Sequence, residues 1–262
     1  MSLTGKTKAG SYKDLLQMNN SNSGVDQTVR AVADGEGTVS ALGLADDVVK
    51  ILPQNDDTTT TFVVTDKDNN TLLGVDSTND LVKAGIGQHI VNTQVKGFCI
   101  TSANSQPSTA DTWSALSSLG SARFGADLQF GTGSTPDTSY TVATTADDLV
   151  QAIWYLPFNI TIDSVNVWFG QSAASGENVK FSVMSYDVVT APTSSGGDLS
   201  NGAEVCVSPA TVTGFGYEQA YMQNLTVSTA NVDSGKAIMA FAHQNNTNSD
   251  LTVNMQLVYH LR

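Results

Sequence analysis

Apolar and polar residues alternate over short runs along most of the chain, and this period of two predicts a protein built mainly from β-strands. The clearest series lies in residues 61–85, where three runs of β-forming residues are separated by two polar clusters. Short strands joined by turns rich in Asp and Asn are typical of an antiparallel meander. The expected strands are 61–65, 71–75 and 81–83, and the expected turns are 66–70 and 76–80.

A ribbon of three such short strands needs a partner, because alone it has nothing against which to bury its apolar side. Either it packs on the larger block that follows, or copies of the chain supply the missing sheets around an axis. An internal repeat favours the second arrangement, since residues 41–51 (ALGLADDVVKI) resemble residues 72–84 (LLGVDSTNDLVKA) with two residues added in the second turn. Repeated units that cannot bury an apolar face alone are typical of stacked arrays. Chance similarity between hairpins with related turns is the alternative.

Residues 1–24 are predicted to form an anchoring arm. The pattern after residue 10 is that of a helix N-terminus, with Ser11 as the cap and an acidic residue three positions later. A helix of about two turns is unstable in isolation, so its apolar side chains are expected to dock on a neighbouring subunit or on a different protein. The predicted docking residues are Tyr12, Leu15 and Leu16.

The remainder of the chain, residues 86–262, has the pattern of a two-sheet antiparallel β-sandwich of jelly-roll type. One short helix is expected at 111–119, capped by Asp111. The predicted fold is thus mainly β, with an N-terminal arm containing a short helix (1–24), a short interwoven β-ribbon shaft (25–85) and the sandwich head (86–262). The strands expected in the head are 90–100, 127–130, 150–156, 160–169, 179–186, 204–207, 225–227, 237–242 and 251–261.

Composition narrows the range of partners. The 262 residues carry a formal net charge of −13, which argues against nucleic acid and anionic membrane surfaces, since both require a basic patch. No apolar run approaches membrane-spanning length, and the first residues lack the apolar core of a signal peptide, so synthesis in the cytoplasm of the producing cell is expected. The two cysteines, Cys99 and Cys206, are far apart in sequence and are predicted to be buried free thiols.

No motif predicts catalysis, a metal or a cofactor. Residues 66–70 begin like a calcium-binding loop, but Thr71 stands where the loop needs glycine and Ser77 where it needs glutamate, so a polar turn is the preferred interpretation. A glycosidase would need a pair of carboxylates, yet the Asp residues, among them Asp147, Asp148 and Asp187, are spread like turn formers. We therefore expect a protein that is not an enzyme.

Carbohydrate binding is the chemistry that the sequence leaves open. Aromatic residues close to Gly, Asn and Gln are typical of sugar sites, and the glycines of residues 213–221 predict a loop that presents its aromatic side chains. The competing interpretation is that these aromatic residues pack in the core of the sandwich. The candidate glycan-binding residues are Trp168, Phe215, Tyr217 and Tyr221.

Several segments resemble structural proteins of tailed bacteriophages, in particular trimeric virion fibres, spikes and head-decoration proteins. They are GKTKAGSYKDLL (5–16), NSNSGVD (20–26) and FVVTDKDNN (62–70), and the region from residue 160 through YEQAY (217–221) to 258–260 is similar to the distal β-sandwich heads of such proteins. The resemblance implies a homotrimer in the virion, anchored by its N-terminal part to other virion proteins of the capsid or the tail. It also implies a C-terminal head that faces outward. The alternative function, which rests on the aromatic residues named above, is host attachment by an adhesin that binds a host-receptor glycan.

Overall fold

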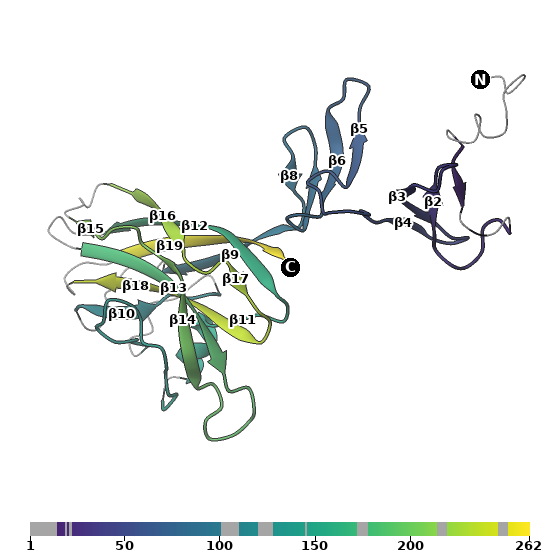
Figure 1. Cartoon of the computed structure of the whole chain (residues 1–262). Coiled ribbons are helices and arrows are strands. Elements are labelled where there is room, and N and C mark those ends of the chain that lie inside the picture. The colour runs from purple at the N-terminus through teal and green to yellow at the C-terminus, as the bar shows by residue number, and fades with distance from the viewer. Residues whose placement is uncertain are drawn as a thin grey trace, which may run out of the picture. The chain divides into compact units, whose positions relative to one another are not determined.

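The computed structural model describes residues 15–18, 20, 23–100, 110–119, 128–144, 146–171, 178–213, 219–245 and 251–262. It is a mainly β structure with antiparallel sheets, as the alternating pattern predicts (Figure 1). The chain divides into two compact units, residues 1–92 and 93–262. This boundary falls after Asn92, further along the chain than the sequence-based boundary between residues 85 and 86.

The first unit contains two four-stranded antiparallel meanders. Each follows the order of the chain, so every strand pairs with the strand that precedes or follows it. The first meander consists of β1 (Gln17–Met18), β2 (Arg30–Ala33), β3 (Val39–Leu44) and β4 (Val49–Ile51). The second consists of β5 (Phe62–Thr65), β6 (Thr71–Asp76), β7 (Leu81–Ala84) and β8 (His89–Ile90). The three strands expected in residues 61–85 are present as β5, β6 and β7.

The second unit is one large antiparallel sheet of eleven strands that curls on itself. Its main path runs β10-β18-β13-β14-β16-β12-β19-β9, and β11, β15 and β17 pair at its margins. The two ends approach each other where Cys99 of β9 exchanges backbone hydrogen bonds with Ser117, just beyond β10. The strands are β9 (Thr93–Ile100), β10 (Thr112–Ala115), β11 (Trp154–Tyr155), β12 (Ile160–Gln171), β13 (Asn178–Val188), β14 (Leu199–Val207), β15 (Val212–Thr213), β16 (Tyr221–Val227), β17 (Asn231–Val232), β18 (Lys236–Gln244) and β19 (Leu251–Leu261).

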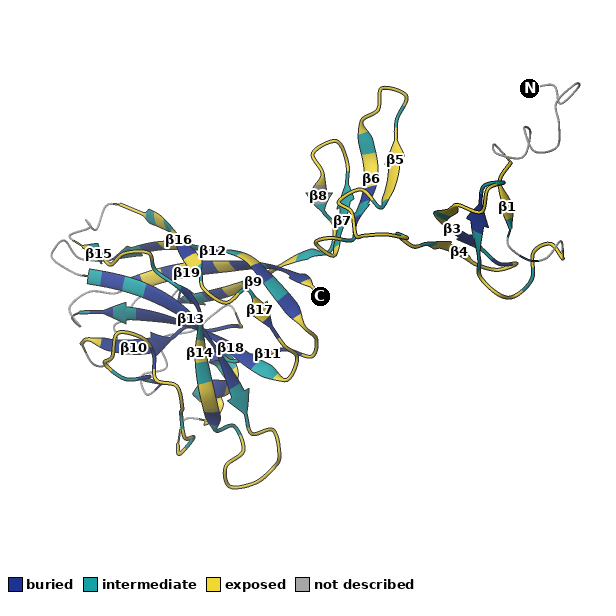
Figure 2. Cartoon of the chain, viewed as in Figure 1, coloured by how far each residue is buried: buried dark blue, intermediate teal, exposed yellow. Residues whose placement is uncertain are grey.

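The two halves of this sheet are covered differently. In β18, residues Ala237–Ala242 are all buried, because successive side chains enter two separate clusters. One cluster fills the space inside the curled sheet, and the other lies beneath residues 128–144 and the helix α2 (Ala146–Ala152). In β19, by contrast, buried and exposed residues alternate from Leu251 to Leu257. The half formed by β16, β12, β19 and β9 therefore has one buried face and one face open to solvent (Figure 2).

Two local predictions are wrong. Residues 111–119 do not form a helix, because β10 pairs with the end of β18 and Trp113 and Ala115 pack in the core. Residues 150–156 are not one strand, since the helix α2 ends at Ala152 and only β11 is extended. Asp147 and Asp148 lie in the first turn of α2, where negative charge favours a helix.

The helix predicted to begin at Ser11 is not supported where it can be examined. Residues 1–14, and with them Tyr12, lie outside the described residues. Within the described part, Leu15 and Leu16 are not helical, and β1 pairs with β2 through Gln17 and Met18. Strand pairing with the first meander therefore replaces the last turn of the expected helix.

Candidate functional site

The two meanders of the first unit are built on one plan, which extends the repeat seen in the sequence. Gly43 of β3 pairs with Ala31 and Lys50, and Gly74 of β6 pairs with Val63 and Lys83. Gly and Lys thus occupy the same places on the two sheets, and a small apolar residue, Ala31 or Val63, faces each glycine from the preceding strand. The repeat consequently covers three strands, from β2 to β4 and from β5 to β7.

An Asp carboxylate stabilises the turn between the first two strands of each repeat in the same way. The Asp34 carboxylate accepts the backbone N–H groups of the residues two and four positions later, at 2.9 and 2.8 Å, and that of Asp66 does the same at 2.8 and 2.9 Å. The residue three positions after each Asp has a left-handed backbone, with φ of 89° at Gly37 and 64° at Asn69. Hydrogen bonds lower the pKa of both carboxyls, chiefly the backbone N–H of Thr38 for Asp34 and the side-chain amide of Asn70 for Asp66.

The hydrogen bonds of Asp66 within this turn explain why the sequence of residues 66–70 resembles the start of a calcium-binding loop. One oxygen of Asp66 accepts two backbone N–H groups, and the other accepts the side-chain amide of Asn70 at 2.9 Å. A carboxylate engaged by three N–H donors acts as a turn-forming acceptor. Among the residues that the structure describes, no group of three or more His, Cys, Asp or Glu side chains is placed to hold a metal ion.

The second meander has one apolar face. Strand pairing places six apolar side chains of β5, β6 and β7 on the same side of the sheet, and we call this side the apolar face. Phe62, Val64 and Leu73 remain 36–41% exposed on it, and the other three are partly buried. Figure 2 shows the exposed residues along β5 and β6. The residues of the apolar face are Phe62, Val64, Leu73, Val75, Val82 and Ala84.

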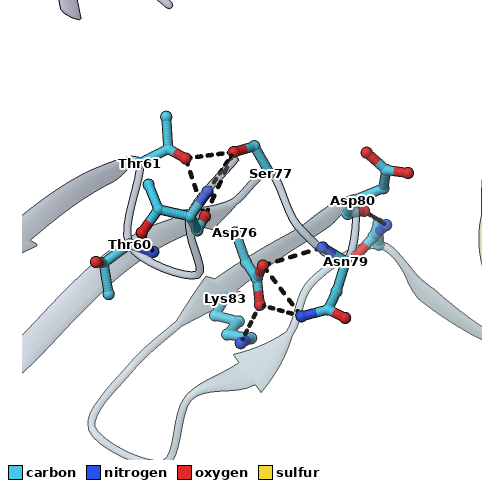
Figure 3. A network of polar contacts seen from close by, with 9 residues as sticks. Thr60, Thr61, Asp76, Ser77, Asn79, Asp80 and Lys83 are labelled. Carbon is cyan, nitrogen blue, oxygen red and sulfur yellow. Dashed lines mark hydrogen bonds and ion pairs between the residues drawn. The ribbon is translucent and has the colours of Figure 1, made fainter. Parts of the chain in front are cut away.

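The opposite side of this sheet is held by a polar network (Figure 3). Asp76 is 1% exposed, and its carboxylate accepts a hydrogen bond from the Lys83 ammonium at 2.8 Å. It also accepts the backbone and side-chain N–H groups of Asn79 at 3.0–3.2 Å. The Lys83 hydrogen bond, followed by those of Asn79, lowers the pKa of Asp76 to about 2. This network fixes the turn between β6 and β7.

A second contact ties the chain entering β5 to the same turn. The Ser77 N–H donates to the carbonyl of Thr58 at 3.0 Å, and the Thr58 N–H donates back to the Ser77 hydroxyl at 3.2 Å. The hydroxyl groups of Thr61 and Ser77 share a further hydrogen bond. The second meander is therefore held together mainly by backbone pairing and polar turns.

Buried apolar side chains are scarce throughout the first unit. Within its described residues only Val32, Ala33 and Ala45 are buried apolar residues, all in the first meander or at its edge. The two large apolar clusters lie entirely in the second unit. Sheets that bury so little apolar surface are not expected to be stable alone. The first unit therefore has the form of an incomplete structure.

The first meander also exposes apolar groups. Val49 is 70% exposed and Leu52 is 48% exposed. A hollow of about 240 Å³ lies on one side of this sheet. Its lining includes Val29, Ala31, Ala41, Gly43, Lys50 and Leu52.

The predicted docking residues that the structure describes are at the surface. Leu15 is 45% exposed and Leu16 is 72% exposed. They immediately precede β1, at the edge of the first meander. Their exposure leaves both side chains free for contact with another chain.

The predicted glycan residues do not form one group. Trp168 is 49% exposed on the open side of β12, whereas its neighbour Phe169 points into the core and pairs with Tyr221. Tyr221 packs against Phe169 with ring centroids 5.8 Å apart, so it lies on the opposite face of the sheet from Trp168. Phe215 and Tyr217 lie outside the described residues.

Sequence reasoning missed the surroundings of Trp168. Strand pairing places Met222 and Asn254 directly beside it, from β16 and β19. In residues 252–256 polar positions alternate with buried ones, and this alternation was the available sequence signal that these polar side chains share one open face. The sequence did not reveal which strands lie next to β12.

The carboxylates considered for catalysis have structural neighbours. Asp187 is bonded to Lys236 and to Asn201, and the Lys236 hydrogen bond is the main cause of its lowered pKa. Asp147 and Asp148 belong to the first turn of α2.

Comparison with known proteins identifies no family. No family model matches the chain, and no curated protein matches it. A solved structure of an α-amino acid ester hydrolase labelled with selenomethionine aligns at 8% identity and a TM-score of 0.28, over 48% of this chain and 28% of that chain. The match spans less than a third of the hydrolase. No helix in the described part of the chain is long and apolar enough to cross a membrane.

Proposed function

We propose that this chain is a non-enzymatic structural protein that functions as a homotrimer, in which the first unit assembles copies of the chain and the second unit is an outward head. The observation that carries the proposal is the apolar face of the second meander. Its six apolar side chains lie in a unit that has only three buried apolar residues among those described. Copies of the same chain are the simplest source of the missing apolar surface.

A threefold arrangement of chains can cover the apolar face of each second meander. In a trimer the apolar face of each chain meets those of two others around a common axis, and a closed set of sheets leaves fewer open strand edges. The polar network of Asp76 and Lys83 lies on the opposite side of the sheet. Each second meander would then contribute one wall of a short interwoven shaft, with the side that carries Asp76 and Lys83 outward.

The strand order of the second unit supports a head of jelly-roll type. Its halves run β9-β19-β12-β16 and β10-β18-β13-β14. Numbering the eight main strands in chain order gives 1-8-3-6 and 2-7-4-5, which is the order produced by folding a long antiparallel hairpin twice. Jelly rolls of this kind are used by viral capsid and lectin domains.

We place this protein in the virion of a tailed bacteriophage, as a fibre, spike or capsid decoration protein. This placement rests on the sequence resemblance, on the head topology and on the incomplete first unit. Leu15 and Leu16, exposed at the edge of the first meander, are the described part of the proposed anchor to other virion proteins.

Solution mass tests the proposal directly. The full chain should have a mass of three times 27.5 kDa by light scattering coupled to size exclusion. A chain restricted to residues 93–262 should be folded and monomeric, because it contains both apolar clusters. A monomeric full chain whose second meander is folded would contradict the proposal.

A further inference from the structure

The open face of the β16-β12-β19-β9 half carries an ordered set of neutral side chains. In one row, Trp168 lies between Met222 and Asn254 on the neighbouring strands. In the next row, Asn166 lies between Asn224 and Gln256. Paired residues on adjacent strands are about 5 Å apart, and successive rows on one face are about 7 Å apart. We call these six side chains the amide face.

The four amides of this face have unused hydrogen-bonding groups. Asn224, Asn254 and Gln256 are exposed, and Asn166 is partly buried. None of the four side chains hydrogen-bonds to another residue in the described parts of the chain. Each amide offers two N–H donors and a carbonyl oxygen whose two lone pairs can each accept a hydrogen bond. The face therefore presents donors and acceptors in equal measure to an external partner.

Among the tryptophans that the structure describes, Trp168 is the one with an exposed indole ring. Trp113 is fully buried, and Trp154 packs against the core. Trp168 is 49% exposed, and the adjacent Met222 is 54% exposed. An exposed aromatic ring on the surface of a sheet is a group on which a partly apolar ligand can stack.

The face is also uncharged. Gly97 of β9 pairs with Gln256, and a Cβ atom at Gly97 would meet no atom within 4 Å, so packing does not require glycine there. The six residues of the face carry no charge, although the whole chain has a net charge of −13. Charge complementarity therefore favours a neutral ligand over a cationic or anionic one.

We propose that the amide face binds neutral saccharide. A sugar presents C–H groups on one side of its ring, which suit the indole of Trp168, and hydroxyl groups at its edges, which both donate and accept hydrogen bonds as amides do. The two rows across three strands accommodate a short oligosaccharide chain. This site excludes Tyr221, which lies on the buried side of the sheet.

Affinity electrophoresis of the full-length chain tests this assignment. The probes are dextran, mannan and galactan as neutral polymers, with alginate as an acidic comparator. At least one neutral polymer should retard the wild-type chain, and its addition should change the tryptophan fluorescence. Trp168→Ala should weaken binding by roughly tenfold or more, as expected for a stacking aromatic anchor. Asn254→Ala should weaken binding by about two- to tenfold, the loss expected for one neutral hydrogen bond.

The controls separate binding from folding. Tyr155 is exposed to a similar extent, 45%, but lies on β11, away from the amide face, so Tyr155→Ala should bind like the wild type. Trp168→Phe should recover part of the affinity, because it restores an aromatic surface. Circular dichroism of each variant confirms that the fold is retained.

The assignment would be overturned if no neutral polymer retards the folded wild-type chain, if alginate alone retards it, or if Trp168→Ala binds as well as the wild type. A fall in oligomeric mass in Trp168→Ala would also overturn it, by identifying the face as an interface between copies. Sugar binding is measured independently of mass. A monomer that binds dextran would therefore refute the proposed trimer and leave the sugar site standing.

Discussion

Replacing Val64 by aspartate is predicted to dissociate the proposed trimer, whereas the same replacement at the adjacent Val63 is not. The two side chains are matched, since Val64 is 41% exposed and Val63 is 39% exposed, and both belong to β5. They point to opposite sides of the sheet. Val64 pairs with Leu73 on the apolar face, and Val63 pairs with Gly74 on the side that holds Lys83.

The magnitude follows from the exposed fraction. Full burial of a valine side chain contributes about 1.5 kcal/mol, so covering the 41% that is exposed at Val64 contributes about 0.6 kcal/mol per chain and about 2 kcal/mol per trimer. This loss alone lowers the association constant by roughly 30-fold. Each buried carboxylate adds a desolvation cost of several kcal/mol, and three of them around one axis repel each other. Val64→Asp should therefore be monomeric at low micromolar concentration.

Sedimentation velocity of wild type, Val64→Asp and Val63→Asp at matched concentrations is the assay. Circular dichroism shows whether each variant keeps its β-structure, and both substitutions lower β-propensity equally. Trimeric Val64→Asp, or equal dissociation of both variants, would refute the assignment of the apolar face to the assembly interface.

Three further predictions concern local structure. The pKa of Asp76 is lowered to about 2 from an ordinary 3.8, so its contribution to stability is fully present above about pH 4 and is lost as the pH falls towards 2. Lys83→Met should raise the pKa of Asp76 in a carboxyl NMR titration. An unchanged pKa would contradict the role of the Lys83 ammonium. Burial raises the pKa of the Cys206 thiol to about 12, so iodoacetamide at pH 8 should leave the Cys206 peptide unlabelled until the protein is unfolded, as mass spectrometry can show. Gly202→Ala should cost about 1–3 kcal/mol in urea unfolding, because its Cβ would lie 2.5 Å from a buried tyrosine ring and 2.7 Å from a backbone carbon, whereas Gly97→Ala should be nearly neutral.

The elements that the sequence predicts well are those in which local chemistry and the final structure agree. The strands β5 to β7 are bounded by Asp- and Asn-rich turns, and the hydrogen bonds of Asp66 and Asp76 show that these side chains build the turns themselves. The alternation in β19 likewise reflects one buried and one open face. In such segments the nearest neighbours in sequence are sufficient to determine the conformation.

Prediction fails where distant residues decide the structure. Residues 111–119 combine an acidic cap with helix-compatible spacing, but pairing of Trp113 with His243 of β18 draws them into the sheet. The same limit applies to the amide face. Trp168 is evident in the sequence as an aromatic residue on a strand, but only strand order brings Met222 and Asn254 to its sides. Tyr221 could not be separated from Trp168 before the register of β16 was established.

The way in which the chain enters the second unit has a mechanical consequence. Strand β9 begins at Thr93, directly after the boundary, and pairs in register with β19 from His260 back to Val253. A tension transmitted through the first unit therefore reaches the head at the start of an eight-residue strand. When such a load acts along the strand, it strains all of these hydrogen bonds in parallel instead of peeling them one at a time. A load in that direction therefore shears the β9–β19 ladder of the second unit, and a ladder resists shear better than peeling.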